Sequence, residues 1–72
     1  MKAKDVRVFI QQGDFKKALS GAKNFRIGVT KEQRSAMRRA YEAIIHPRFY
    51  EQLGVDIEMA IQEGITVLKA IV

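Results

Sequence analysis

Residues 30–45 read TKEQRSAMRRAYEAII and carry the clearest secondary-structure signal in the chain. Thr30 followed by Gln33 fits a capping box, which predicts a helix from Lys31 to about Ile45. At about 100° per residue, apolar side chains gather on one side of this helix and mostly charged ones on the other. The apolar side holds Met37, Ala40, Tyr41 and Ile44, and the polar side holds Lys31, Arg34, Ser35, Arg38 and Glu42. A helix with two such sides packs in a helical bundle and presents a basic surface to water.

Two shorter helices are expected before this one. In segment 4–12 the apolar residues fit a helix, but they also alternate as in a strand, at Val6, Val8 and Ile10. We interpret the segment as a helix, because no later segment resembles a strand that would pair with it. Gly13 then ends this helix and Asp14 caps the next one. The apolar face of that next helix repeats at helical spacing, at Phe15, Ala18, Leu19 and Ala22.

The C-terminal part predicts a short helix and a long one. Pro47 disfavours helical geometry at His46, so the long helix ends there and a short helix begins, which runs to Leu53 before Gly54. Asp56 caps the last helix, whose apolar stripe includes a glycine: Ile57, Ala60, Ile61, Gly64, Ile65, Leu68 and Ile71. That glycine costs about 1 kcal/mol of helix propensity, so we expect another helix to pass close to it. The prediction is one all-α domain spanning residues 1–72, a bundle of four to five short helices.

The composition limits the class of function. With 72 residues, 47% of them hydrophobic, the chain holds one small domain and excludes a two-domain protein or a large enzyme. The absence of cysteine excludes disulfides, zinc–thiolate sites and thiol nucleophiles. The charged start does not resemble a signal peptide, and no run of about 18 apolar residues would cross a membrane. We therefore expect a cytoplasmic protein without a membrane segment.

The charge is distributed unevenly along the chain. Residues 1–50 hold twelve Lys or Arg against four acids, whereas residues 51–72 hold one Lys against four acids. The net charge of +5 thus combines a basic body of +8 with an acidic C-terminal helix of −3. Because long-range attraction follows the local field, any anionic partner should meet the first fifty residues.

Two short resemblances stand beside these patterns. The string GDFKKAL at residues 13–19 resembles the turn and second-helix start of a tetratricopeptide repeat. A repeat array would show the same string 34 residues on, where Pro47 stands instead, so the resemblance implies only a helical hairpin joined at Gly13–Asp14. Residues 27–54 look like small proteins of phage and prophage origin. That likeness implies a mobile-element origin and assigns no active residue.

Catalytic motifs are weak. The single histidine, His46, is a candidate base toward Ser20 or Ser35 in a small hydrolase, the third hypothesis for this chain. Acyl transfer also needs an orienting acid and an oxyanion hole, and no Gly-x-Ser-x-Gly elbow is present. One His and scattered carboxylates give no metal-ligand spacing, and no phosphate-binding glycine loop exists. We predict a protein that is not an enzyme and that uses no cofactor and no metal.

The leading hypothesis is docking on another protein with an acidic surface. Exposed Tyr beside Arg is typical of protein–protein hot spots, and such residues occur at Arg34, Arg38, Arg39, Arg48 and Tyr50. The sequence leaves open whether Phe49 and Tyr50 close the bottom of the core or form the contact. Val67 and Val72 widen the apolar stripe of the last helix beyond what four short helices need. We therefore expect a second copy of the chain, as a homodimer, or a partner to cover part of it.

The alternative hypothesis is binding to a nucleic-acid backbone through Lys31, Arg34 and Arg38. These like charges stand one turn apart and repel unless phosphates neutralise them. Further candidates to extend the patch are Lys23, Arg26, His46 and Arg48, with Tyr41 or Tyr50 to stack on a base. Glu42, one turn beyond Arg38, is a competing partner for that arginine. A helix-turn-helix reading at Gly54–Val55 is disfavoured, because the helix that follows opens with carboxylates that phosphates repel.

Overall fold

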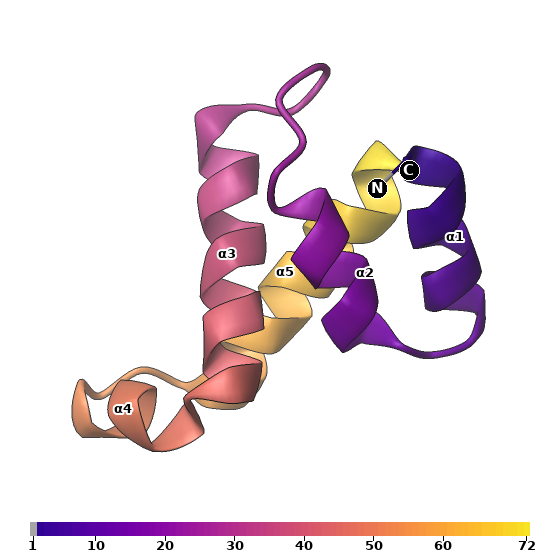
Figure 1. Ribbon diagram of the computed structural model, residues 1–72. Helices are drawn as coiled ribbons and strands as arrows, with labels where there is room; N and C mark the ends of the chain where they lie inside the picture. Colours follow the sequence, from indigo (N-terminus) through magenta and orange to yellow (C-terminus); the bar gives the residue numbers. More distant parts are fainter. Residues whose placement is uncertain (1) are drawn as a thin grey trace.

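The computed structural model describes residues 2–72 and consists of five α-helices joined by short connections (Figure 1). In chain order they are α1 Ala3–Gln11, α2 Phe15–Ala22, α3 Lys31–Ile45, α4 Pro47–Gln52 and α5 Ile57–Ile71. Every regular element among the described residues is an α-helix, which confirms the all-α prediction, including the helical interpretation of segment 4–12. None of these helices has the length and apolar character needed to cross a lipid bilayer.

Local capping interactions place the helix ends where the sequence predicts them. The Gln33 amide donates to Thr30 Oγ1 at 3.1 Å, and the Thr30 amide donates to Gln33 Oε1 at 2.9 Å, which completes the capping box. Asp14 and Asp56 likewise accept hydrogen bonds from amides three residues on. Gly13 and Gly54 follow α1 and α4 with φ of 76° and 78°, the left-handed conformation that other residues rarely adopt. These bonds satisfy amide groups that a helix end would otherwise leave unpaired.

Helices α3 and α5 pack closely against each other, and they approach most tightly at Gly64 of α5. A methyl group built on Gly64 would overlap the Ala40 Cβ and would approach the Ala36 carbonyl oxygen to 3.2 Å. The two helices are therefore as close here as a glycine permits, which confirms the predicted helix contact at this position. Ala40 and Ala43 are fully buried and Arg38 is exposed, so the charged side of α3 faces away from the core.

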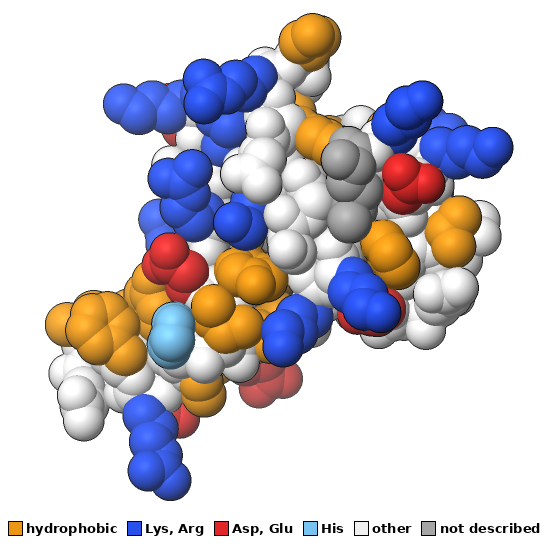
Figure 2. Space-filling model, in the orientation of Figure 1, with side chains coloured by type: hydrophobic (Ala, Val, Ile, Leu, Met, Phe, Trp, Pro, Cys, Tyr) orange, Lys and Arg blue, Asp and Glu red, His pale blue; other side chains and the backbone are white. Residues whose placement is uncertain are grey.

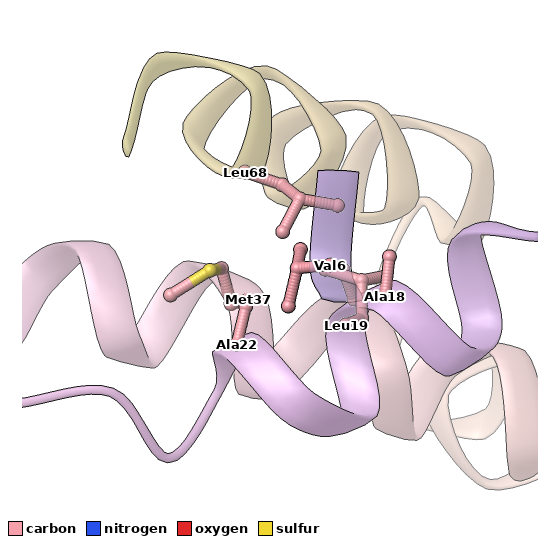
Figure 3. Packing of buried hydrophobic residues seen from close by; sticks show 7 residues of the cluster. Val6, Ala18, Leu19, Ala22, Met37 and Leu68 are labelled. Atoms are coloured by element: carbon pink, nitrogen blue, oxygen red, sulfur yellow. The ribbon is translucent and has the colours of Figure 1, made fainter. Parts of the chain in front are cut away.

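The core lies where α1 and α2 cover the α3–α5 pair. Figure 3 shows buried side chains from these four helices meeting in one cluster. Its members are Val6, Ala18, Leu19, Ala22, Met37, Ala40 and Leu68. Helix α4 contributes no buried residue and lies at the C-terminal end of α3, away from α1 and α2 (Figure 1). The two ends of α3 thus have different surroundings: the α2–α3 loop at its start, and α4 at its end.

Candidate functional site

A hollow of about 410 Å³ lies between the start of α3 and the segment that follows α2. We call it the basic concavity. Its lining is entirely polar and consists of Lys23, Asn24, Arg26, Lys31, Arg34, Ser35 and Arg38. Five of these seven residues carry a positive charge, and within residues 2–72 neither a carboxylate nor an apolar side chain lines it. Figure 2 shows Lys and Arg side chains gathered on this part of the molecule.

Helix α3 supplies one wall of the basic concavity. Lys31, Arg34 and Arg38 lie three to four residues apart, so they project from one face of the helix. The other side of α3 packs into the core, where Met37 is fully buried. The capping box at Thr30 fixes where the helix starts and therefore places Lys31 in its first turn. The predicted two-sided character of α3 is confirmed by this burial pattern.

The segment after α2 supplies the other wall. The Phe25 amide donates to the Ala22 carbonyl oxygen at 3.0 Å, and the Phe25 ring packs against the core. Lys23 and Arg26, on either side of this anchor, reach the lining of the basic concavity. Two segments of the chain therefore converge on one space with positive charge from both sides.

The positive charges in the basic concavity have no acidic partners. The ion pairs found among residues 2–72 join Lys17 to Asp14 at 3.8 Å and Arg39 to Glu63 at 3.9 Å, and neither involves a lining residue. The helix dipole adds partial positive charge at the start of α3. The arrangement leaves an uncompensated positive field in a recess, which favours an anion as the occupant.

Glu42 does not neutralise Arg38, contrary to the pairing that their spacing suggested. It accepts a hydrogen bond from the Tyr50 hydroxyl, which approaches from α4. This bond raises the pKa of Tyr50, and desolvation and the negative charge of Glu42 act in the same direction. Helix α4 brings the Tyr50 hydroxyl within hydrogen-bonding reach of Glu42, and this carboxylate is therefore engaged by Tyr50 and not by Arg38.

Lys23 is held in place by an aromatic ring. Its Nζ lies 5.0 Å from the centroid of the Tyr41 ring, which is half-buried and packs against the core. A cation over a ring face is attracted by the ring quadrupole, and the contact restricts the long lysine side chain. One face of Tyr41 is thereby covered, so the ring that the sequence offered for base stacking serves here to position a charge.

The structure brings only part of the predicted site together. Arg34 and Arg38 share the basic concavity with Lys31, the full set predicted for a nucleic-acid backbone. Of the other residues predicted to contact a protein, Arg39 lies beside α5, where it pairs with Glu63, and Arg48 lies on α4. Asn24 was not predicted as a site residue, and Ser35 was predicted only as a candidate nucleophile, not as part of a basic site. The signal that would have found them is their position next to cationic neighbours on the loop and on the polar side of α3.

The aromatic residues of α4 divide into one exposed and one half-buried ring. Phe49 is 57% exposed, and Leu53, which follows α4, is 62% exposed. The half-buried Tyr50 packs edge-on against Phe49, with ring centroids 5.4 Å apart. A shallow hollow beside them is lined by Glu42, His46, Phe49 and Tyr50. Neither serine proposed as a nucleophile lines the hollow that holds His46. The α4 end therefore exposes two large apolar side chains among charged and polar ones, with one acid–phenol bond.

The apolar stripe of α5 is largely used by the fold itself. Val67 and Val72, which the sequence assigned to a second copy or a partner, pack against the core cluster and are half-buried. Helices α2 and α3 cover more of α5 than the sequence indicated. Met59 remains exposed beside a shallow groove that also includes Ala36 and Val67.

Other chemistry has little support in the described residues. Within residues 2–72, no three His, Asp or Glu side chains come together as a metal-ligand group. Comparison with family models, with curated proteins and with solved structures finds no match for this chain. The chemistry of the basic concavity is thus what indicates a function.

Proposed function

We propose that this protein is a non-catalytic cytoplasmic module that binds the phosphate backbone of nucleic acid through the basic concavity. The observation that carries the proposal is a recess in which five Lys or Arg side chains converge without a carboxylate among the lining residues. Proteins hold nucleic-acid backbones mainly with Arg and Lys, assisted by neutral polar groups such as those of Asn and Ser. The lining of the basic concavity has that composition.

A phosphate backbone suits this lining better than an acidic protein does. Protein–protein hot spots typically combine Arg with aromatic side chains, and the basic concavity has arginines but no aromatic or apolar side chain in its lining. Three of its five cations are Arg26, Arg34 and Arg38, whose planar guanidinium groups bind phosphate oxygens in pairs. Binding should therefore depend on charge and salt, and hardly on sequence.

The direct test is a salt titration with fluorescently labelled oligonucleotides of unrelated sequences. Each neutralised phosphate contributes about 0.9 to the slope of log affinity against log salt for duplex, so five contacts give a slope of about −4.5. We expect binding at about 50 mM salt that weakens steeply as salt rises. Absence of binding at that salt concentration contradicts the proposal.

The matched variants separate the basic concavity from total charge. The double variant Arg34→Ala/Arg38→Ala should flatten the slope by about two units and weaken binding equally for all sequences. The control is Arg7→Ala/Arg48→Ala, which removes the same charge from two exposed positions outside the basic concavity. Equal losses in the two double variants would show that overall charge, and no particular site, holds the nucleic acid.

A second candidate function is docking on a protein with an acidic surface, and the exposed side chains of α4 favour it. Phe49 and Leu53 lie on the surface near Arg48, which combines apolar area with a positive charge. Capture of a partner protein from the host by variants at each end of α3 would show which end binds it. Loss of that partner in Phe49→Ser, with full capture by Arg34→Ala/Arg38→Ala, supports this candidate; the reverse pattern contradicts it.

A further inference from the structure

The loop between α2 and α3 carries an unusually exposed apolar side chain. Ile27 is 97% exposed, whereas the next most exposed large hydrophobic residue among residues 2–72, Leu53, is 62% exposed. An isoleucine gains nothing from water at this position, and the surrounding fold does not use it. Single exposed apolar residues are ordinary on protein surfaces, so what distinguishes Ile27 is its place directly after Arg26, which lines the basic concavity.

The loop holds Ile27 outward because its neighbours are anchored. Phe25 and Val29 both pack against the core, two residues before and two residues after Ile27. Gly28 has φ of 73°, which turns the chain sharply just after Ile27. Thr30 then caps α3 through two hydrogen bonds. With the chain fixed on both sides, the tip of the loop projects from the surface (Figure 1).

The apolar tip lies beside the basic concavity. Arg26, the residue before Ile27, lines the concavity, as does Lys31 at the start of α3. Figure 2 shows a hydrophobic side chain at the tip of this loop, close to the gathered Lys and Arg side chains. One ligand can therefore meet the positive recess and the isoleucine at the same time.

We propose that Ile27 is a wedge that inserts between neighbouring bases of the nucleic acid whose backbone lies in the basic concavity. This inference rests on the proposed function and adds how the bases are engaged. Proteins that bind the minor groove of duplex DNA frequently insert Ile, Leu, Met or Phe into a base step, which partly unstacks it. The β-branched side chain of Ile27 is stiff, and the anchored loop limits its movement, so little freedom is lost on insertion.

An anionic lipid surface would also attract an apolar tip flanked by cations, but the geometry favours nucleic acid. The cations lie in a recess with two walls, which matches a rounded strand or duplex better than a flat bilayer. A single isoleucine also buries little area in a membrane, where attachment grows with the apolar area buried. Lipid binding is therefore the competing outcome of the test.

The test uses oligonucleotides, single-stranded and duplex, that contain 2-aminopurine, a base whose fluorescence rises when it is unstacked. The wild type should raise this fluorescence on binding. Ile27→Ser should bind roughly tenfold more weakly, with an unchanged salt slope and no rise in fluorescence. Ile27→Leu, which keeps an apolar wedge, should restore both. Because Ile27 makes no core contact, all three proteins should melt at the same temperature, and Leu53→Ser serves as a control for loss of an exposed apolar residue elsewhere.

Each other outcome overturns a defined part of the account. Binding by the wild type without a rise in fluorescence, or an unchanged response in Ile27→Ser, overturns the wedge and leaves the proposed function intact. Absence of binding to every oligonucleotide overturns the proposed function itself. Binding to vesicles of phosphatidylserine and phosphatidylcholine that is lost in Ile27→Ser, while oligonucleotide binding is unchanged, assigns the tip to lipid and also overturns the wedge.

Discussion

The two ends of α3 present different surfaces. At its start, five cations from two segments face one recess and have no acidic partner. At its end, Glu42 is engaged by the phenol of Tyr50 from α4, and Phe49 and Leu53 are exposed and apolar. A helix face that is basic in sequence thus becomes a continuous positive site only where a second segment adds charge. The contrast teaches that the neighbours of a charged helix decide which of its residues remain free to bind.

The largest expected effect is on the core that both ends share. Met37 is fully buried in the middle of α3, and Met37→Ala should lower the free energy of unfolding by about 2–5 kcal/mol through the cavity it leaves. Chemical denaturation followed by circular dichroism measures this loss. Where the variant remains folded, its salt slope should equal that of the wild type, since the basic concavity loses no charge. A changed slope would show that the site and the core are not separable.

The next largest effect is expected when one acid is added at the start of α3, and the same addition on α4 is the control. Ser35 lines the basic concavity, and Ser35→Glu should weaken oligonucleotide binding roughly tenfold, because the new charge opposes phosphate at close range. Gln52→Glu adds the same charge on α4 at an exposed position and should leave the affinity nearly unchanged. Similar losses in the two variants would remove the distinction between the ends.

A smaller effect is expected at the cap that connects the loop to α3. Thr30→Ala removes the side-chain acceptor for the Gln33 amide and should lower the free energy of unfolding by about 1 kcal/mol. The loss should concentrate at the start of α3, where amide hydrogen exchange should accelerate while the end of α3 near α4 is unaffected. Acceleration along the whole helix would mean that the two ends do not fray independently.

The smallest effect is expected at the bond between Tyr50 and Glu42. The pKa of Tyr50 is raised from 10.0, chiefly because its hydroxyl donates to Glu42, so folding favours the neutral phenol. A pKa that is higher in the folded state contributes stability below pH 10, and that contribution disappears as the pH rises through the folded value. Tyr50→Phe should therefore melt slightly below the wild type at neutral pH, by less than Thr30→Ala, and the gap should close above about pH 10.

Spectroscopic titration checks the same bond independently. The chain has two tyrosines, so the ultraviolet difference between wild type and Tyr50→Phe isolates one of them. The isolated transition should lie above the ordinary range for tyrosine. A normal transition, together with a melting gap that persists at high pH, would contradict the hydrogen bond to Glu42.

The local part of this structure could be predicted from the sequence. Three helix starts are fixed by hydrogen bonds between residues three apart, at Asp14, at Thr30 with Gln33, and at Asp56. Neighbouring residues in the sequence therefore suffice to predict them. The close approach at Gly64 was also predictable, because a glycine in an apolar stripe needs a packing reason. Arg34 and Arg38 follow from helical spacing in the same way.

The non-local part could not be predicted. The sequence offered Lys23 and Arg26 as extensions of the basic patch on equal terms with His46 and Arg48. The first two join the site because Phe25 anchors their segment to the core, and no spacing rule encodes that choice. The choice of Glu42 between Arg38 and Tyr50 depends on the angle at which α4 leaves α3. Arg39 pairs with Glu63 because α5 packs alongside α3. In each case a residue distant in the sequence decides which charges stay free.

The most direct measurement follows the backbone amides of isotope-labelled protein by nuclear magnetic resonance during addition of a single-stranded oligonucleotide. We predict chemical-shift changes that concentrate in residues 23–38, from Lys23 through the loop to Arg38, while the amides of α4 stay in place. Changes centred on residues 47–53, or spread evenly over the surface, would contradict the claim that the basic concavity is the binding site.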